Sequence, residues 1–181
     1  LKEKIGEVQE LYKATLLASH RDIQTQQELA SLNKSQQTYP IQDLAQETIN
    51  HLVNLYNEGQ FAIVVEQAQS LTKQYPQAFV IWNILGAAYK GLGRVEEASE
   101  AFKKVTELNP NYANGFNNLG ITLQTLGKYE EAVKAYKNAL LLKPNYAEGY
   151  VNIGTAFEGQ GKLNKAIASY KRAISIKPEY A

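Results

Sequence analysis

The sequence predicts an all-α protein in which helical hairpins follow one another along the chain. The main observation is a spacing of 34 residues that holds over most of the sequence. The glycines and prolines that keep this spacing are Gly59, Gly93, Gly127 and Gly161, and Pro76, Pro110, Pro144 and Pro178. Between them, apolar residues recur three and four positions apart, as on one face of an α-helix. A fixed period of this length is typical of stacked repeats, because one hairpin cannot cover its own apolar face.

Each unit is expected to hold two helices, and residues 113–146 illustrate how they begin and end. Gly127 follows the first helix, where a residue with positive φ can close it without strain. Glu130 and Glu131 then stand in the first turn of the second helix, which favours anions. Pro144 ends that helix, because proline disfavours the α conformation of the residue before it. We expect the small residues Gly120 and Ala132 to face one another and to bring the two helices close.

The chain divides into an N-terminal segment and four units. The predicted ranges are 1–40, 41–78, 79–112, 113–146 and 147–180. The unit at 41–78 is divergent, since it has Leu52 where the others have glycine, Val64 where they have alanine, and Ala68 where they have an aromatic ring. We interpret these exchanges as volume-conserving repacking of the same hairpin.

The N-terminal segment 1–40 is predicted to contain a helix that ends near Ser19 and a linker from Ser35 to Pro40. Apolar residues of the helix fall on one face, which needs a cover. Either this helix packs on the first hairpin as a cap, or it pairs with a second copy or lies in the groove of the array. The sequence leaves these alternatives open.

Three runs of residues carry a resemblance to a known family. They are Trp82, Leu85, Gly86, Tyr89, Ala98, Phe102 and Pro110; then Phe116, Leu119, Gly120, Leu123, Ala132, Tyr136, Ala139 and Pro144; and then Tyr150, Ile153, Gly154, Phe157, Ala166, Tyr170, Ala173 and Pro178. Each run resembles the tetratricopeptide repeat signature. The resemblance implies a right-handed superhelix, a non-enzymatic protein-interaction scaffold, and a peptide or protein ligand on the concave wall formed by the first helix of every hairpin.

The candidate groove residues lie on the wall side of the first helices. They are Asn83, Lys90, Asn114, Asn117, Asn118, Gln124, Asn152, Thr155 and Glu158. Asn118 and Asn152 occupy equivalent positions and resemble the asparagine ladder of O-linked N-acetylglucosamine transferase, in which amides grip a peptide backbone. An amide side chain can both donate to and accept from any peptide group. Lys90 is the one clear cation of the wall, so we do not expect the carboxylate-terminated tails of chaperones to bind here.

Composition argues against several other functions. With 19 basic and 18 acidic residues, the net charge of +1 gives no general reason to bind nucleic acid. No apolar run approaches the roughly 20 residues that cross a bilayer, so we expect a soluble, cytoplasmic protein without membrane insertion. The absence of cysteine excludes thiolate zinc sites and thiol nucleophiles, and His20 and His51 stand apart from any ligand cluster. We therefore predict no catalytic residues, cofactor or metal.

The last residue, Ala181, falls 34 positions after Ala147, at the first position of a further unit. An array without a polar capping helix exposes the apolar side of its last hairpin, here expected near Phe157, Tyr170 and Ile174. We therefore expect a fragment of a longer protein or a homo-oligomer, formed through the N-terminal helix or through the last repeat. The alternative function is a substrate-targeting arm of a larger transferase.

Overall fold

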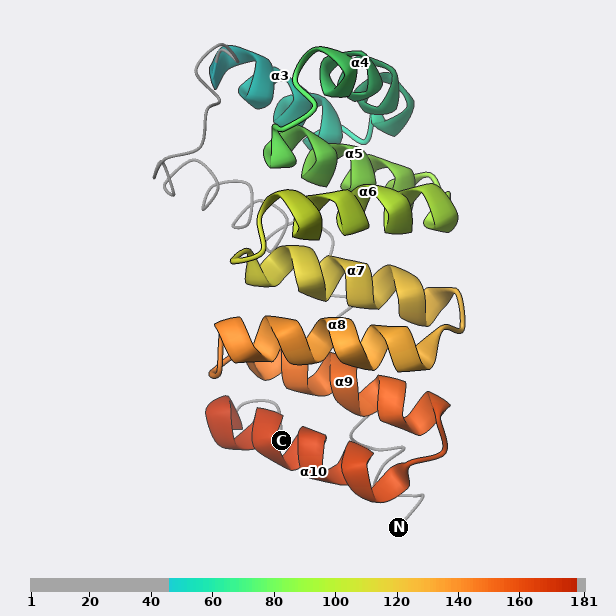
Figure 1. The fold of residues 1–181 in the computed structure, drawn as a ribbon, viewed down its shortest axis with the longest axis vertical. Helices are drawn as coiled ribbons and strands as arrows, with labels where there is room; N and C mark the ends of the chain where they lie inside the picture. The colour runs from blue at the N-terminus through green and yellow to red at the C-terminus, as the bar shows by residue number, and fades with distance from the viewer. Residues whose placement is uncertain (1–45, 179–181) are drawn as a thin grey trace.

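The computed structural model describes residues 46–178, and these residues form eight helices and no strand (Figure 1). The predictions for residues 1–40 lie outside the described part. The helices are α3 Gln46–Asn57, α4 Phe61–Gln74, α5 Phe79–Gly91, α6 Val95–Leu108, α7 Ala113–Thr125, α8 Tyr129–Leu142, α9 Ala147–Gly159 and α10 Leu163–Ile176.

Consecutive helices pack on one another along the length of the molecule (Figure 1). In the last three hairpins the most extensive contacts join the two helices of the hairpin, whereas α4 contacts α5 more extensively than it contacts α3. The first helices also touch each other directly, α3 against α5 and α7 against α9. The predicted all-α superhelical repeat fold is confirmed.

Four glycines close the first helices, for a conformational reason. Gly127 has a φ of 73°, and nothing lies within 4 Å of the position its Cβ would take. Its N–H donates to the carbonyl of Gln124 at 2.9 Å, and the N–H of Lys128 donates to the carbonyl of Leu123 at 2.8 Å. This pattern satisfies carbonyls that the end of the helix leaves without an intrahelical partner.

The interior of each of the last three hairpins is built around a glycine that lies against an aromatic ring. A Cβ on Gly120 would meet the Tyr136 ring, with Cε1 nearest and Cδ1 and Cζ at 2.6 and 2.8 Å. Gly86 meets Phe102 and Gly154 meets Tyr170 in the same way. The sequence prediction paired Gly120 with Ala132; the atoms nearest to a Cβ on Gly120 belong to the Tyr136 ring, four residues after Ala132 in the same helix. Such a ring can pack only where the facing helix lacks a side chain.

In the hairpin of α3 and α4, the first helix carries a large buried residue where the other hairpins have glycine, and the second carries a small one where they have a ring. Leu52, Val64 and Ala68 are all fully buried and belong to one core cluster. Leucine on the first helix and alanine on the second reverse the sizes of the glycine and the ring at these positions in the other hairpins. The predicted volume-conserving repacking therefore agrees with the packing observed here.

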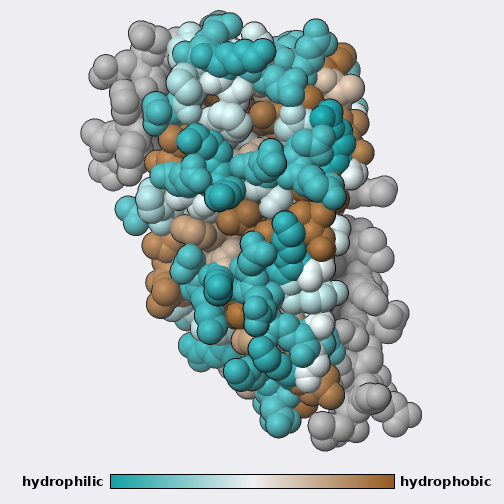
Figure 2. Space-filling view, turned by 45° about the vertical axis from the view of Figure 1, so that its right-hand side comes forward, coloured by the Kyte–Doolittle hydropathy of each residue, from teal (hydrophilic) through white to brown (hydrophobic). Residues whose placement is uncertain are grey.

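Hydrophilic residues cover much of the face seen in Figure 2, and hydrophobic residues gather between them in smaller patches. The prediction that the last hairpin exposes Tyr170 is wrong, because its ring is buried against Gly154 of its own hairpin. Phe157 and Ile174 are half-buried. Among the described residues, the most exposed large hydrophobic side chain is Leu141 on α8, at 79%.

Candidate peptide-binding groove

An amide pair joins two neighbouring first helices in the candidate groove. Asn152 Nδ2 on α9 donates to Asn117 Oδ1 on α7 at 3.0 Å. Asn117 is 1% exposed, whereas Asn152 is half-buried. A buried amide oxygen that lacks a donor costs free energy, so this bond stabilises the spacing of α7 and α9. Asn117 therefore positions the wall and offers almost no surface of its own.

The other predicted groove residues differ in how far they reach solvent. Asn114, Asn118, Gln124, Thr155 and Glu158 are half-buried, and Lys90 is exposed. Asn83 is 4% exposed, and its Oδ1 is buried without a hydrogen-bond partner. The ladder position beside it is taken by Ile84, which is buried. The amide surface of the described wall therefore lies on α7 and α9.

Tyrosines of the second helices hold two of the groove residues through hydrogen bonds. Tyr136 Oη donates to Gln124 Oε1 at 3.1 Å, and Tyr170 Oη donates to Glu158 Oε2 at 2.7 Å. Burial raises the pKa of the Tyr136 phenol, and the Glu148 carboxylate adds to the shift, so this hydroxyl remains a donor at neutral pH.

The hydrogen bonds of these two tyrosines were not predicted from the sequence. The signal was present, because each acceptor precedes its tyrosine by 12 residues in both repeats. In the repeat before them, Phe102 and Lys90 occupy the corresponding positions, and a phenylalanine has no hydroxyl to donate.

A polar pocket of about 320 Å³ opens between the ends of α7 and α9. Its lining includes Gln124, Thr155 and Glu158, three residues of the predicted groove, together with Thr125, Tyr129 and Gly159. The Tyr129 ring lies against the backbone of Gly159, where a Cβ would come within 2.6 Å of Cδ1 and Cζ. The ring thus has a fixed support beside the carboxylate.

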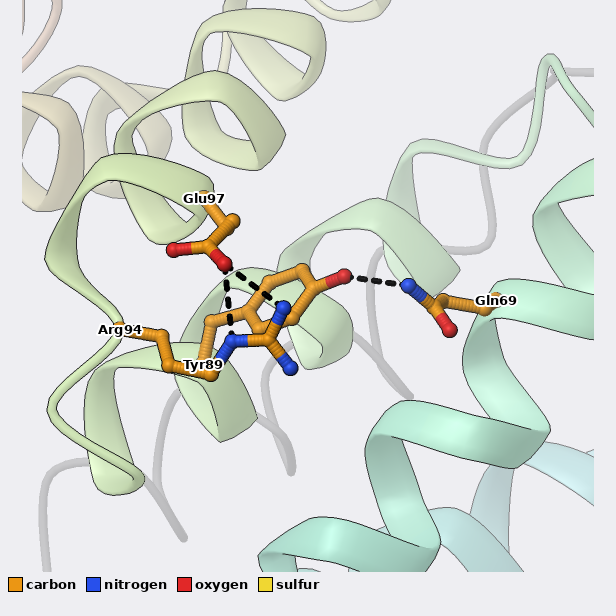
Figure 3. A network of polar contacts seen from close by, with 4 residues as sticks. All are labelled: Gln69, Tyr89, Arg94 and Glu97. Atoms are coloured by element: carbon orange, nitrogen blue, oxygen red, sulfur yellow. Dashed lines mark hydrogen bonds and ion pairs between the residues drawn. The ribbon is translucent and has the colours of Figure 1, made fainter.

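A second polar network lies on the other helices of the array (Figure 3). Gln69 Nε2 donates to Tyr89 Oη, and the Arg94 guanidinium lies 4.6 Å from the centre of the Tyr89 ring. Arg94 in turn binds Glu97 Oε1 through Nε at 2.9 Å and Nη2 at 2.6 Å. The hydrogen bond from Arg94 lowers the pKa of Glu97. This network joins α4 to the hairpin of α5 and α6, and we interpret it as structural.

Within residues 46–178, no three His, Cys, Asp or Glu side chains cluster as a metal site requires. His51 is exposed, and His20 lies outside the described residues. Glu130 and Glu131 stand in the first turn of α8, as predicted, and Glu96 and Glu97 stand in the first turn of α6. The helices of the described part are too short or too polar to cross a membrane.

Comparison with known families decides the identity of the repeats. A model described as TPR repeat matches residues 86–127 and 125–161, and a model described as tetratricopeptide repeat matches residues 147–180. The chain is a tetratricopeptide repeat protein. Members of this family are protein-interaction scaffolds, and the tetratricopeptide array described here has that general role. A comparison with curated proteins found no match.

Solved structures of MamA have the same fold as this tetratricopeptide array. MamA 41-end from Desulfovibrio magneticus RS-1 superposes with a TM-score of 0.70 at 23% identity, covering 76% of this chain and 77% of that one. A crystal structure of MamA covers 98% of this chain and 93% of that one, with a TM-score of 0.67 and 22% identity. A third, MamA AMB-1, is 25% identical with a TM-score of 0.66, covering 74% of this chain and 73% of that one.

Proposed function

We propose that this array is a non-enzymatic scaffold that holds an extended peptide along the wall formed by α7 and α9. The observation that supports it most is the set of half-buried amides on these helices, Asn114, Asn118 and Asn152, with Asn152 oriented by its bond to Asn117. A half-buried amide can bind a ligand without first exposing new surface, and it pairs with peptide N–H and C=O groups alike.

The spacing of the wall suits an extended chain. Packed helices lie about 8–10 Å apart, and an extended peptide advances roughly 3.3 Å per residue. One repeat therefore corresponds to about three residues of ligand. Amides on successive first helices can then meet peptide groups at regular intervals, which selects for an extended backbone more than for a particular sequence.

The experiment uses a peptide selected from a display library on the full chain. Asn118 is the cleaner site for a substitution, because Asn152 also satisfies the buried Asn117. Asn118→Ala should lower the affinity for the peptide by about five- to tenfold, which corresponds to the loss of one net hydrogen bond of roughly 1 kcal/mol. Asn138→Ala removes an exposed amide from α8, outside the wall, and serves as the matched control.

Two results would contradict the proposal that a peptide binds in the groove. One is a library that yields no binder to the folded chain, and the other is equal affinity of Asn118→Ala and the unsubstituted protein.

A transferase assay on this chain should give no turnover. The proposal includes a cytoplasmic location, and the same groove could serve either a free scaffold or the targeting arm of a larger transferase. Homo-oligomer formation remains a prediction that light scattering at several concentrations would check.

A further inference from the structure

The helices α5 and α7 carry two asparagines at the positions of the amide pair that joins α7 to α9. Asn118 follows Asn83 by 35 residues, which is also the separation between Asn117 and Asn152. The first member of each pair is buried, with Asn83 at 4% and Asn117 at 1% exposure. The second member, Asn118 or Asn152, is half-buried. Repeat position and burial are therefore those of a second bond of the same kind.

This second bond is not made in the structure. Asn83 Oδ1 is buried and accepts no hydrogen bond. The side chain of Asn118 donates to no group of the described residues, although its backbone carbonyl accepts from Thr122 Oγ1 at 3.3 Å. The contact of α5 with α7 is also less extensive than that of α7 with α9. Because a buried acceptor without a donor costs free energy, the array gains from any movement that brings a donor to this oxygen.

We propose that Asn83 is a positioning residue for the ligand: when a peptide lies across α5 and α7, the two helices close and Asn118 Nδ2 donates to Asn83 Oδ1. The inference rests on the proposed function of the groove. A peptide that contacts both helices favours the arrangement in which both reach it, and a ligand shifts such an equilibrium toward the state that it binds more tightly. The new bond then adds to the affinity, although Asn83 itself does not touch the peptide.

The donor for Asn83 has to come from the protein, because the oxygen is closed to solvent. A peptide N–H in the groove cannot reach it without displacing the side chains around it. Asn118 holds the position from which Asn152 reaches Asn117 one repeat later. An amide group has two N–H bonds and an oxygen, so Asn118 can donate once to Asn83 and still offer its second N–H and its oxygen to the peptide.

The first measurement is a double-mutant cycle on the stability of the full chain without a ligand, followed by urea unfolding. The variants are Asn83→Leu, which removes the amide at nearly the same side-chain size, Asn118→Ala, and the two combined. Because the bond is not made in the free chain, we expect the fold-changes in the unfolding constant to multiply. The control cycle, Asn117→Leu with Asn152→Ala, removes a bond that is present, so its fold-changes should not multiply.

The second measurement repeats the first cycle on the affinity for a peptide selected from a display library on the full chain. Asn83→Leu should lower this affinity about fivefold, the factor of one net hydrogen bond. In the Asn118→Ala background the same substitution should have no effect, because the donor is already gone. In NMR spectra, a side-chain amide proton of Asn118 should move downfield when the peptide is added, and Asn83→Leu should abolish this shift. Asn138→Ala, on the exposed side of α8, should change neither readout.

Coupling between Asn83 and Asn118 in the free chain as strong as that of the control pair would overturn the inference, because the bond would then exist without a ligand. An affinity loss from Asn83→Leu that is the same in both backgrounds would overturn it too. If Asn118→Ala weakens binding while Asn83→Leu does not, the inference alone fails and the groove stands. If no peptide binds the folded chain, the proposed function fails, and the inference fails with it because the closing of α5 on α7 loses its cause.

Discussion

Gly120→Ala places one methyl group where the structure leaves no room. The new Cβ would lie 2.6 Å from Tyr136 Cδ1 and 2.8 Å from Cζ, far inside van der Waals contact. The Tyr136 ring is among the most buried side chains of the described part, so it cannot turn aside without displacing its neighbours. Such overpacking costs about 1–3 kcal/mol. Alanine also favours the helix by about 1 kcal/mol relative to glycine, so we expect a net destabilisation of about 0–2 kcal/mol.

Because these two terms oppose each other, the substitution is most informative in two backgrounds. Tyr136→Leu removes the ring and opens the space in front of residue 120. In that background the steric term disappears, and Gly120→Ala should become neutral or stabilising by up to about 1 kcal/mol. The sign of the effect would thus depend on a side chain that lies in another helix. Urea unfolding followed by far-ultraviolet circular dichroism measures each difference.

Gly127→Ala is the matched control. Its Cβ would meet nothing within 4 Å, but the φ of 73° places the residue in the left-handed region. The expected cost is about 1–2 kcal/mol, from backbone strain alone, and it should be the same in the parent protein and in the Tyr136→Leu background. A Gly120→Ala protein that is more stable than the parent, or equally destabilised in both backgrounds, would refute the packing argument.

Three further predictions concern polar groups. Asn152→Ala should destabilise the protein by about 1–3 kcal/mol in urea unfolding, because it leaves the buried oxygen of Asn117 without a donor, whereas a variant of a solvent-facing amide should not. Burial raises the pKa of Tyr136 above its ordinary value of 10.0, so the contribution of this residue to stability should be constant below that pH and fall as the pH rises past it. Tyr136→Phe should reduce this alkaline loss, seen as a smaller change of the urea midpoint. Because Arg94 lowers the pKa of Glu97, the pair should contribute to stability above the ordinary pKa of 4.5, and this contribution should be lost as the pH falls through the lowered pKa of Glu97. Glu97→Gln should therefore lessen the acid dependence of the melting temperature. An identical dependence in both proteins would contradict the role of this pair.

The amino-acid sequence by itself determined the repeat and the path of the chain through each hairpin. Periodic glycines and prolines act on the backbone at their own position or at the residue before, so their effect can be predicted without knowing which other helices lie nearby. Gly127 closes a helix through its own φ, and Pro144 limits the residue before it. The exchange of sizes at Leu52 and Ala68 was also readable, because two departures from one pattern compensated each other.

Only the tertiary structure decided which side chains meet between helices. The sequence analysis assigned both Asn117 and Asn118 to the wall side of their helix, yet one is buried against Asn152 and the other is half-buried. The same limit applies to Gly120, whose close contact with the Tyr136 ring was not predicted. These contacts depend on how far apart the helix axes lie and how they cross, and that geometry is set by the packing of all the side chains between them. The pocket at Glu158 arises in the same way, from two helix ends and a ring that are brought together by the stacking of the hairpins.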